Sequence, residues 1–493
     1  MTTPVLNYIK TRITTLFPSK KEFNQELKNF NPLPALREMN WQHWQYFIIG
    51  FFAWTFDAFD YFAVSINVSN LSKDFDKSIK DITWAITLVL MLRSVGSIIV
   101  GYFADKYGRK WPLIINLAIL SILQIGTGFV KTFDQFLGIR AIFGVAMGGM
   151  FGVASATALE SAPQRSRSIL SGIFQEGYAF GYLLVVAFQR AFIQTPKTWR
   201  SLFWFSSGPP LLIIGWRLTL PENEAFLEQQ LHLKSKNFSF IKDAIKVLSR
   251  HWLKLIYMVL LMAGFNFMSH GSQDLYPTLL SKQLQFSENA STVTNSVANL
   301  GAITGGIIVG HCSGLIGRRF AIIFSCIGGG ALIYPWAFSK GSGINAGAFF
   351  LQFFVQGAWG VIPIHLAELS PPEFKAFVSG TAYQLGNLAS SASSTIESTI
   401  GERFPLPELG PGVYDYAKVM SIFMGCVFVY VLITTLVGPE NRNGEINFKL
   451  TGEDLNLLQA KGSVVDEEVK IGSSDINDNT SLDEKFRFEH REK

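Results

Sequence analysis

Long apolar runs recur along the whole chain, and they constrain its fold more than any other feature of the sequence. A run of 18 or more apolar residues is typical of a transmembrane helix, which needs about 20 such residues to cross the bilayer core. Inside that core every backbone polar group must be satisfied within the protein, so only helices and closed barrels can span it. Because 48% of the residues are hydrophobic and only 16% are charged, the sequence predicts an all-α membrane protein.

The apolar runs predict twelve membrane spans. They cover residues 45–69, 82–104, 111–130, 134–157, 169–192, 201–219, 252–276, 292–311, 319–338, 344–366, 377–398 and 419–437. The polar segment before the first span contains no short apolar region with a small-residue cleavage site, so we expect no removable signal peptide. The tail from about Asn441 is acidic and polar, which predicts disorder.

Lys and Arg are unevenly distributed among the predicted loops. They are concentrated before span 1, in the 2–3, 4–5 and 8–9 loops and in the segment between spans 6 and 7, which share one side if the helices alternate. Cytoplasmic loops carry such an excess, so we expect both termini in the cytoplasm. The 5–6 loop, with Arg190, Lys197 and Arg200, runs against this pattern. The net charge of +5 thus reflects topology rather than a nucleic-acid partner, and the cytoplasmic tails are candidate sites of regulatory modification.

Two motifs occur twice in the chain. Gly101–Lys110 (GYFADKYGRK) returns in degenerate form as Gly310–Arg319 (GHCSGLIGRR), 209 residues further along, from position 101 to position 310. Glu160–Pro163 returns at nearly the same offset as Glu368–Pro371. Two parallel six-helix halves with the substrate held between them are a known plan for secondary transporters. The sequence therefore predicts five parts: a cytoplasmic segment (1–44), a first six-helix bundle (45–219), a cytoplasmic linker (220–251), a second bundle (252–437) and a disordered cytoplasmic tail (438–493).

The repeated motif and one further segment resemble known families. Gly101–Lys110 resembles the signature loop of the major facilitator superfamily and lies in the matching position between spans 2 and 3. Residues 266–278 (NFMSHGSQDLYPT) are similar to the signature of the fungal JEN-type carboxylate/proton symporters, with every defining position filled. The superfamily resemblance covers about residues 45–437. The JEN-type resemblance implies symport of short-chain carboxylates, such as lactate, pyruvate, succinate or malate, with protons across the plasma membrane.

Asn266, His270 and Asp274 are spaced four residues apart, which places all three on one face of a helix. A charge at the centre of a membrane costs roughly 2.5–3.5 kcal/mol on insertion scales, so such groups usually face a partner or an aqueous cavity. The face therefore predicts a polar path, and the JEN-type resemblance implies that all three residues are functional. Asn266 lies deepest and is a candidate for substrate binding.

Arg93 is a candidate ligand for a substrate carboxylate. It lies in span 2 about twelve residues before Asp105, or about 18 Å from the cytoplasmic end of the helix. A guanidinium at that depth offers a planar fork that can bind a carboxylate through two nitrogens. The alternative is an internal ion pair with Asp57 or Asp60 in span 1, and both arrangements can occur in turn within one cycle. The JEN-type resemblance implies a substrate-binding arginine in this helix.

His270 and Asp274 are candidates for carrying the proton. A histidine titrates near pH 6.5, so an acidic exterior would load it and a neutral cytoplasm would unload it. However, His270 lies about 27 Å along the helix from Trp252, close to the outer mouth, so a gating pair with Asp274 that never binds substrate is the alternative. Asp57 and Asp60 compete for the same role, and the sequence does not rank these residues.

Two further residues are implied by the resemblance. In the JEN-type family a phenylalanine in helix 5 and a glutamine in helix 11 help to set substrate choice, and Phe174 and Gln384 match them. The alternative for Phe174 is a core or lipid-facing side chain. Glycines flank both positions and allow helices to approach closely.

The loop that contains Asp105 and Arg109 is predicted to be a conformational latch rather than a substrate site. Asp105 can accept hydrogen bonds from a helix N-terminus or an arginine when the cytoplasmic side is closed. The second copy has Gly314 in place of Asp105, so a latch on that half must be weaker or differently built.

Three classes of function remain at this point: a proton-coupled carboxylate symporter, a uniporter for a neutral solute, and a non-transporting nutrient sensor on the same fold. Arg93 and the His270 face argue against a neutral solute, and short tails argue against a sensor. The chain shows no nucleophile–base pair and no metal-binding spacing, so we expect neither an enzyme nor a cofactor or metal.

Overall fold

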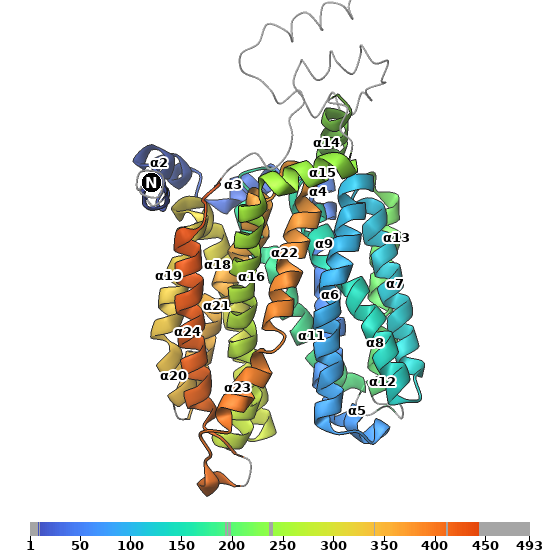
Figure 1. The fold of residues 1–493 in the computed structure, drawn as a ribbon, viewed down its shortest axis with the longest axis vertical. Coiled ribbons are helices and arrows are strands. Elements are labelled where there is room, and N and C mark those ends of the chain that lie inside the picture. The colour runs from blue at the N-terminus through green and yellow to red at the C-terminus, as the bar shows by residue number, and fades with distance from the viewer. Residues whose placement is uncertain are drawn as a thin grey trace, which may run out of the picture.

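The computed structural model describes residues 8, 10–192, 195, 199–235, 240–339, 341–410 and 413–442. These residues are almost entirely helical, and helices of similar direction stand side by side in two groups (Figure 1). The described part contains one isolated β-bridge, between Pro405 and Tyr414.

The first group, which we call the N-terminal half, runs from α4 to α13. Its helices are α4 (Trp41–Ile66), α5 (Val68–Phe75), α6 (Ile79–Tyr107), α7 (Lys110–Phe129), α8 (Phe133–Gly148), α9 (Met150–Leu159), α10 (Arg167–Gln175), α11 (Gly177–Phe192), α12 (Trp199–Ser206) and α13 (Gly208–Thr219).

The second group, the C-terminal half, runs from α16 to α24. Its helices are α16 (Trp252–Gln273), α17 (Tyr276–Thr278), the π-helix η1 (Leu279–Gln283), α18 (Glu288–Ile316), α19 (Arg318–Ala331), α20 (Ile333–Phe338), α21 (Gly343–Leu369), α22 (Lys375–Ser390), α23 (Ser393–Gly401) and α24 (Tyr416–Val437).

Each predicted span coincides with one helix or with consecutive helices. Among the described residues, nine helical segments, including α8 with α9 and α10 with α11, are long and apolar enough to cross a membrane. The other three spans are pairs of shorter helices: α12 with α13, α19 with α20, and α22 with α23. The first pair is interrupted where Gly208, Pro209 and Pro210 follow α12, because proline lacks the N–H that would continue the helical ladder.

Local sequence signals start and stop the long helices. The side chain of Ser78 accepts a hydrogen bond from the backbone N–H of Asp81 at the start of α6, and Asn40 caps α4 in the same way. The turns that follow α6 and α18 pass through Gly108 and Gly317, which have φ values of 104° and 99°. Only glycine adopts such a backbone without strain, so the repeated motif encodes the same turn in both halves.

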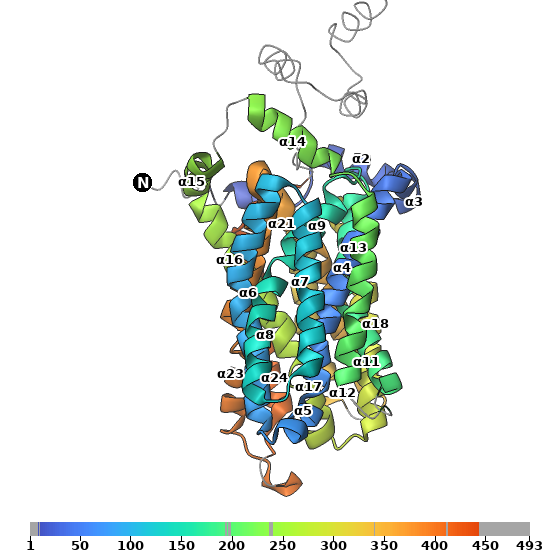
Figure 2. The same ribbon diagram turned by 90° about the vertical axis from the view of Figure 1, so that its right-hand side faces the viewer.

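The linker helices α14 (Glu224–Ser235) and α15 (Phe240–Arg250) both lie at one end of the molecule (Figures 1 and 2). We call this the linker end. The short helices α2 (Lys20–Lys28) and α3 (Pro32–Arg37) lie at the same end, whereas α5, α12 and α23 lie toward the opposite end.

Residues 10–40, which precede α4, are ordered and pack on the C-terminal half, which the sequence did not predict. The rings of Phe17 and Phe320 lie 4.3 Å apart, and the imidazole of His311 lies 2.8 Å from the carbonyl oxygen of Phe30. The buried guanidinium of Arg319 donates to the carbonyl of Arg12 at 3.0 Å. The N-terminal segment thus joins the first helix of one half to the surface of the other.

The predicted disordered tail is also ordered at its beginning. The carboxylate of Glu440 accepts hydrogen bonds from the backbone N–H groups of Arg318 and Arg319, and Asn441 donates to the carbonyl of Glu368. The rest of the predicted disordered tail, from residue 443, lies outside the described residues.

Candidate functional site

Arg93 and Asp57 form an ion pair inside the N-terminal half. One terminal nitrogen of Arg93 on α6 lies 3.1 Å from a carboxylate oxygen of Asp57 on α4, and both side chains are buried. The guanidinium also lies 5.6 Å from the centre of the Tyr61 ring. The second Asp57 oxygen and the Arg93 Nε have no hydrogen-bond partner among the described residues. The fork of Arg93 is therefore only partly used.

Two other buried arginines show what full use of the fork looks like. Arg109 binds both oxygens of Glu160 at 2.9 and 2.8 Å, and Arg318 binds both oxygens of Glu368 at 3.1 and 3.0 Å. Such two-nitrogen pairs are the stronger and more specific ones. By contrast, Arg93 holds Asp57 through one nitrogen only.

Asp60 lies apart from Arg93, although it is only three residues from Asp57. It interacts with Gln124, Ser206 and Arg140, which come from α7, α12 and α8. Gln124 also accepts a hydrogen bond from Arg140 at 2.9 Å. Asp60 is thus buried in a polar network within the N-terminal half, and the structure separates the two carboxylates that the sequence could not rank.

His270 and Asp274 contact each other on α16. The Nδ1 atom of His270 lies 3.2 Å from a carboxylate oxygen of Asp274. The side chain of Asp274 is 37% exposed and that of His270 is 11% exposed, so the pair is open to solvent on the Asp274 side. One turn deeper, Asn266 is buried and donates to the backbone carbonyl of Met262 on its own helix.

Three other polar residues of the 266–278 motif, Ser269, Ser272 and Gln273, face α21 instead. Gln352 donates to Ser272 and accepts from Gln273, both at 3.1 Å. Gln356 donates to Ser269 at 3.3 Å. These hydrogen bonds fix the rotation of α16 against α21, which in turn directs Asn266, His270 and Asp274 along another face.

Residues of α22 complete the polar group around His270. Asn387 is a hydrogen-bonding neighbour of His270 and donates to the side-chain oxygen of Gln384 at 3.0 Å. Gln384 is fully buried, and its nitrogen has no partner among the described residues. The charge of Arg93 acts on both His270 and Tyr383, so the polar groups of the two halves face each other.

Phe174 belongs to an aromatic layer that crosses between the halves. Its ring stacks on Trp54 with centroids 6.2 Å apart, and it is fully buried. Tyr383 of the C-terminal half stacks on Phe151 at 4.1 Å and meets Trp54 edge-on at 5.9 Å. In this conformation Phe174 therefore supports a packed layer next to the site and has no open surface for a ligand.

The halves are joined at the linker end. Asp105 accepts hydrogen bonds from the backbone N–H groups of Ala376 and Phe377, at 3.1 and 2.8 Å, at the start of α22. It also lies 3.1 Å from Arg109. A carboxylate at a helix N-terminus is stabilised by the unpaired N–H groups there. The predicted latch residues thus bridge the N-terminal half to α22.

The second copy of the motif makes a different contact, as the Gly314 substitution led us to expect. Ser168 of α10 lies beside Gly314 and accepts a hydrogen bond from Arg318 at 2.9 Å. Ser171 donates to the carbonyl of Gly360 and accepts from the N–H of Ile364. Its hydroxyl therefore bridges two backbone groups of α21 that are four residues apart.

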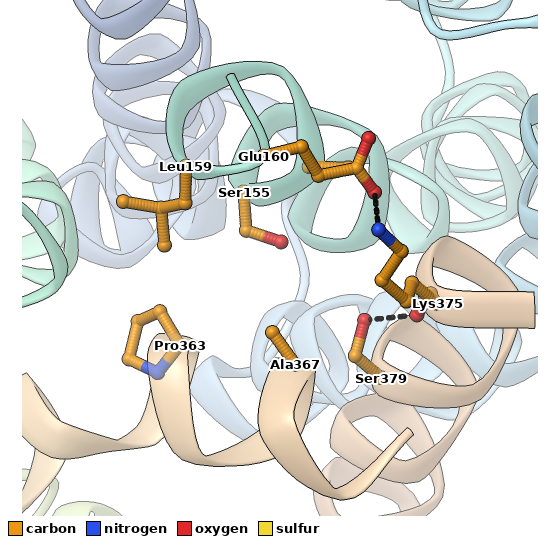
Figure 3. Close-up of a pocket in the computed structure, with 8 residues that line it drawn as sticks. Ser155, Leu159, Glu160, Pro363, Ala367, Lys375 and Ser379 are labelled. Atoms are coloured by element: carbon orange, nitrogen blue, oxygen red, sulfur yellow. Dashed lines mark hydrogen bonds and ion pairs between the residues drawn. The ribbon is translucent and has the colours of Figure 1, made fainter. Parts of the chain in front are cut away.

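A small cavity of about 20 Å³ remains within this closure, which is about the space of one water molecule. Glu160 from one half and Lys375 from the other form an ion pair of 3.4 Å beside it, with Ser155 and Ser379 on either side (Figure 3). The described structure is therefore closed at the linker end, while Asp274 is exposed nearer the opposite end.

Sequence reasoning missed several residues of the site. Asn387 lies one helical turn from Gln384, a signal that helix periodicity could have supplied. Tyr61, Tyr383 and Trp54 gave no signal, because an aromatic residue in an apolar span looks the same whether it faces lipid, core or substrate. In the described part, no group of three or more His, Cys, Asp or Glu side chains could hold a metal ion.

Comparisons with known proteins agree with this architecture. The family model described as "Sugar (and other) transporter" matches residues 30–443. The chain is 41% identical over 481 residues to the carboxylic acid transporter protein homolog of Saccharomyces cerevisiae, covering 92% of this chain and 77% of that protein. It is 25% identical over 358 residues to the cis,cis-muconate transport protein of Acinetobacter baylyi, covering 71% and 86%.

Solved structures share the fold. The proton:xylose symporter XylE of E. coli, bound to 6-bromo-6-deoxy-D-glucose, superposes with a TM-score of 0.67 at 18% identity, over 85% of this chain and 99% of that one. The human organic anion transporter MFSD10 superposes with a TM-score of 0.61 at 13% identity, over 81% and 100%. The predicted all-α, twelve-span fold is thereby confirmed. This chain is a membrane transporter rather than an enzyme, and it belongs to the sugar (and other) transporter family of the major facilitator superfamily.

Proposed function

We propose that this protein is a proton-coupled symporter that imports short-chain carboxylates, such as lactate, pyruvate, succinate or malate, across the plasma membrane by alternating access. The observation that carries the proposal is the partly used fork of Arg93, which is buried, makes one bond to Asp57, and has an Nε without a hydrogen-bond partner among the described residues. A hydroxyl or carbonyl of a neutral solute would accept single hydrogen bonds from the fork, whereas a carboxylate can accept two at once and also balance the buried positive charge.

Supporting this substrate class, the yeast relative is named a carboxylic acid transporter homologue and the Acinetobacter relative transports cis,cis-muconate. In the proposed cycle the substrate carboxylate replaces Asp57 on Arg93, and Asn266 and Gln384 contact the rest of the molecule. Phe174 acts on substrate choice through the aromatic layer that it supports.

Protons are proposed to bind at the intramembrane acids and histidine. His270 with Asp274 lies nearest to solvent, so it is the first group that an external proton would meet. Asp57 takes a proton when the substrate displaces it from Arg93, because a buried carboxylate without a cation is costly. Asp60 lies in a separate network with Arg140, which makes it a second candidate site.

Orientation and domain motion complete the proposal. The linker end is placed in the cytoplasm together with both termini, because it carries the Lys/Arg-rich segments. Epitope tags at either terminus should bind antibody only after the plasma membrane is permeabilised; binding to intact cells would reverse the orientation.

The bundles 45–219 and 252–437 move as units, and the Asp105–Arg109 latch holds them together when the cytoplasmic side is closed.

The decisive experiment measures proton entry in proteoliposomes. Labelled lactate and succinate are supplied in parallel across external pH, and internal acidification is recorded at each addition. Proton co-entry is needed as a readout because a weak acid is itself more protonated at low pH. Saturable carboxylate uptake without proton influx would reject the coupling, and absence of carboxylate uptake would reject the substrate class.

Variants of Arg93 test the binding role directly. Arg93→Ala should abolish carboxylate uptake while the protein still reaches the membrane, and Arg93→Lys should restore little, because an ammonium is a point charge without a planar fork. Near-normal uptake kinetics in Arg93→Ala would remove Arg93 from the site.

A further inference from the structure

Glu176 is a buried carboxyl group that the proposed cycle does not use. It lies between α10 and α11, is 3% exposed, and neither of its carboxylate oxygens has a hydrogen-bond partner among the described residues. Ionised carboxylates in such places are either paired with a cation or converted to the neutral acid. Both oxygens are buried without a hydrogen-bond partner, and no ion pair joins them to a cation in the described part of the chain, so the neutral acid is the form that this packing can hold.

The position of Glu176 is set by the contact between the halves. Its carboxyl group lies directly on the backbone of Gly306 on α18, so closely that a Cβ added to that glycine would lie 1.7 Å from the carboxylate oxygen. One turn earlier on α10, Gly172 packs on the same stretch of α18. The burial of Glu176 therefore exists only while α10 of one half stays in contact with α18 of the other.

Other charged groups on the surrounding elements are engaged elsewhere. On α4, Asp57 pairs with Arg93 and Asp60 interacts with Arg140, while on α10 the guanidinium of Arg167 donates to the Ala162 carbonyl. His311 on α18 contacts the carbonyl of Phe30, and Glu368 on α21 pairs with Arg318. His365 on α21 lies five residues beyond Gly360 toward the linker end, and both of its buried ring nitrogens lack a hydrogen-bond partner among the described residues.

From this geometry we infer that Glu176 is a proton-binding site filled and emptied from the linker end, and that the two halves close at that end only when it holds a proton. Separation of α10 from α18 would admit water from the linker end, where the carboxyl O–H bond breaks and the proton passes to that water. Reclosure takes one proton back from the same side, so this proton does not add to the number carried with substrate.

The inference rests on the proposed alternating-access cycle, but it can be tested without substrate or a proton gradient. Tyr107 at the end of α6 and Trp252 at the start of α16 are exposed by 55% and 54% and lie on opposite halves at the linker end. Spin labels on cysteines at these two positions, in a background without Cys312, Cys326 and Cys426, report the separation of the halves. The population of the short, closed distance is then measured against pH.

In the otherwise unchanged protein the closed population should fall several-fold as pH rises. Glu176→Gln, which mimics the neutral acid, should remain closed at all pH values, whereas Glu176→Asp keeps a carboxyl group and should keep the pH dependence. Glu397→Gln is the matched control, because Glu397 is also buried without a partner among the described residues but lies on α23. It should behave like the parent protein.

Two results would overturn the inference. The first is that the closed population of the parent protein does not depend on pH, or that Glu176→Gln shows the same pH dependence as the parent. The other is a change in the ratio of protons to substrate in Glu176→Gln, because that would make Glu176 a carrier filled from the opposite side. If the parent protein transports carboxylate without proton entry, the proposed function is wrong, but the effect of pH on the distance between the halves would still test the role of Glu176.

Discussion

At the scale of single residues, the pairing of Arg93 with Asp57 makes the substrate and a side chain competitors for one guanidinium. The pair is made through one nitrogen, at 3.1 Å, in a fully buried setting. An ion pair of this kind is costly to break if one partner is left alone, about 3–5 kcal/mol, and much less so if another carboxylate takes its place. Exchanging Asp57 for the substrate carboxylate therefore costs less free energy than breaking the ion pair and leaving Arg93 alone.

Asp57→Asn should tighten carboxylate binding and slow turnover. Without its competitor Arg93 is free for the substrate, and a gain of about 1.4 kcal/mol would lower the dissociation constant tenfold. Release slows because nothing replaces the substrate on the guanidinium. Binding is measured by isothermal titration and turnover by counterflow. Asp74→Asn, which removes a partly exposed ion pair with Arg200 outside the site, is the control and should leave affinity unchanged. Weaker binding in Asp57→Asn would contradict the competition.

His270→Ala separates a proton carrier from a gate. If His270 carries the proton, substrate exchange should persist while uptake loses its dependence on pH, because the remaining rearrangements need no proton. If His270 is held by Asp274 as a gate, either single variant should damage every mode of transport, and the double variant should be little worse, as for a contacting pair. Counterflow in proteoliposomes decides between them, since loss of both exchange and substrate binding is incompatible with a carrier role alone.

At the scale of helices, the number and order of the spans followed from the sequence, but their interruptions did not. Hydropathy reports whether a segment can lie in lipid, and it is insensitive to breaks such as those between α10 and α11 or α22 and α23. The helices α2 and α3 were missed because they are short, with nine and six residues, and helices of that length are marginal on local preference alone.

The candidate site was predictable to a similar extent. Arg93, His270 and Asp274 stood out because a charge inside an apolar run is costly unless it is used. The partner of Arg93 was left open between Asp57 and Asp60. The two residues are three positions apart on one helix, and the sequence does not show which of them faces the neighbouring helix that carries Arg93. Glu176 was visible as an acid in a span, but its contact with Gly306 is tertiary.

Asp105→Asn should weaken closure at the linker end. The carboxylate interacts with the N-terminus of α22, and such an interaction contributes about 0.3–2 kcal/mol, depending on burial. The population of the closed form should fall by the corresponding factor when distances between the halves are measured. Glu38→Gln is the control at the same end, because its ion pair with Arg165 is exposed and contributes about 1 kcal/mol or less. Equal effects of the two substitutions would show that Asp105 is not a latch.

At the scale of the whole molecule, the N-terminal segment connects the halves outside their main interface. It packs on α18, α19 and the end of α24, and it then enters the N-terminal half at α4. Any movement that separates the halves at the linker end must therefore move or stretch this connection.

Removal of residues 1–30 should lower the melting temperature of the detergent-solubilised protein by several degrees. Buried Arg319 would lose the carbonyl of Arg12, and Phe320 and His311 would lose their aromatic neighbours. Ile13→Ala, at a position that is 68% exposed, is the control and should leave the melting temperature unchanged. A truncated protein as stable as the full chain would show that these contacts contribute nothing to the C-terminal half.

The glycine turns after α6 and α18 also bear on the history of the chain. Gly108 and Gly317 adopt nearly the same backbone, with φ values of 104° and 99°, although the acid three residues before the first has become Gly314 before the second. A gene that duplicated and fused would leave such a record: the bend of the main chain admits no substitute and stays in both copies, whereas a side-chain task can be kept by one copy and lost by the other. Divergence then turns a symmetric ancestor into a protein whose two contacts between the halves at the linker end are held by unequal bonds.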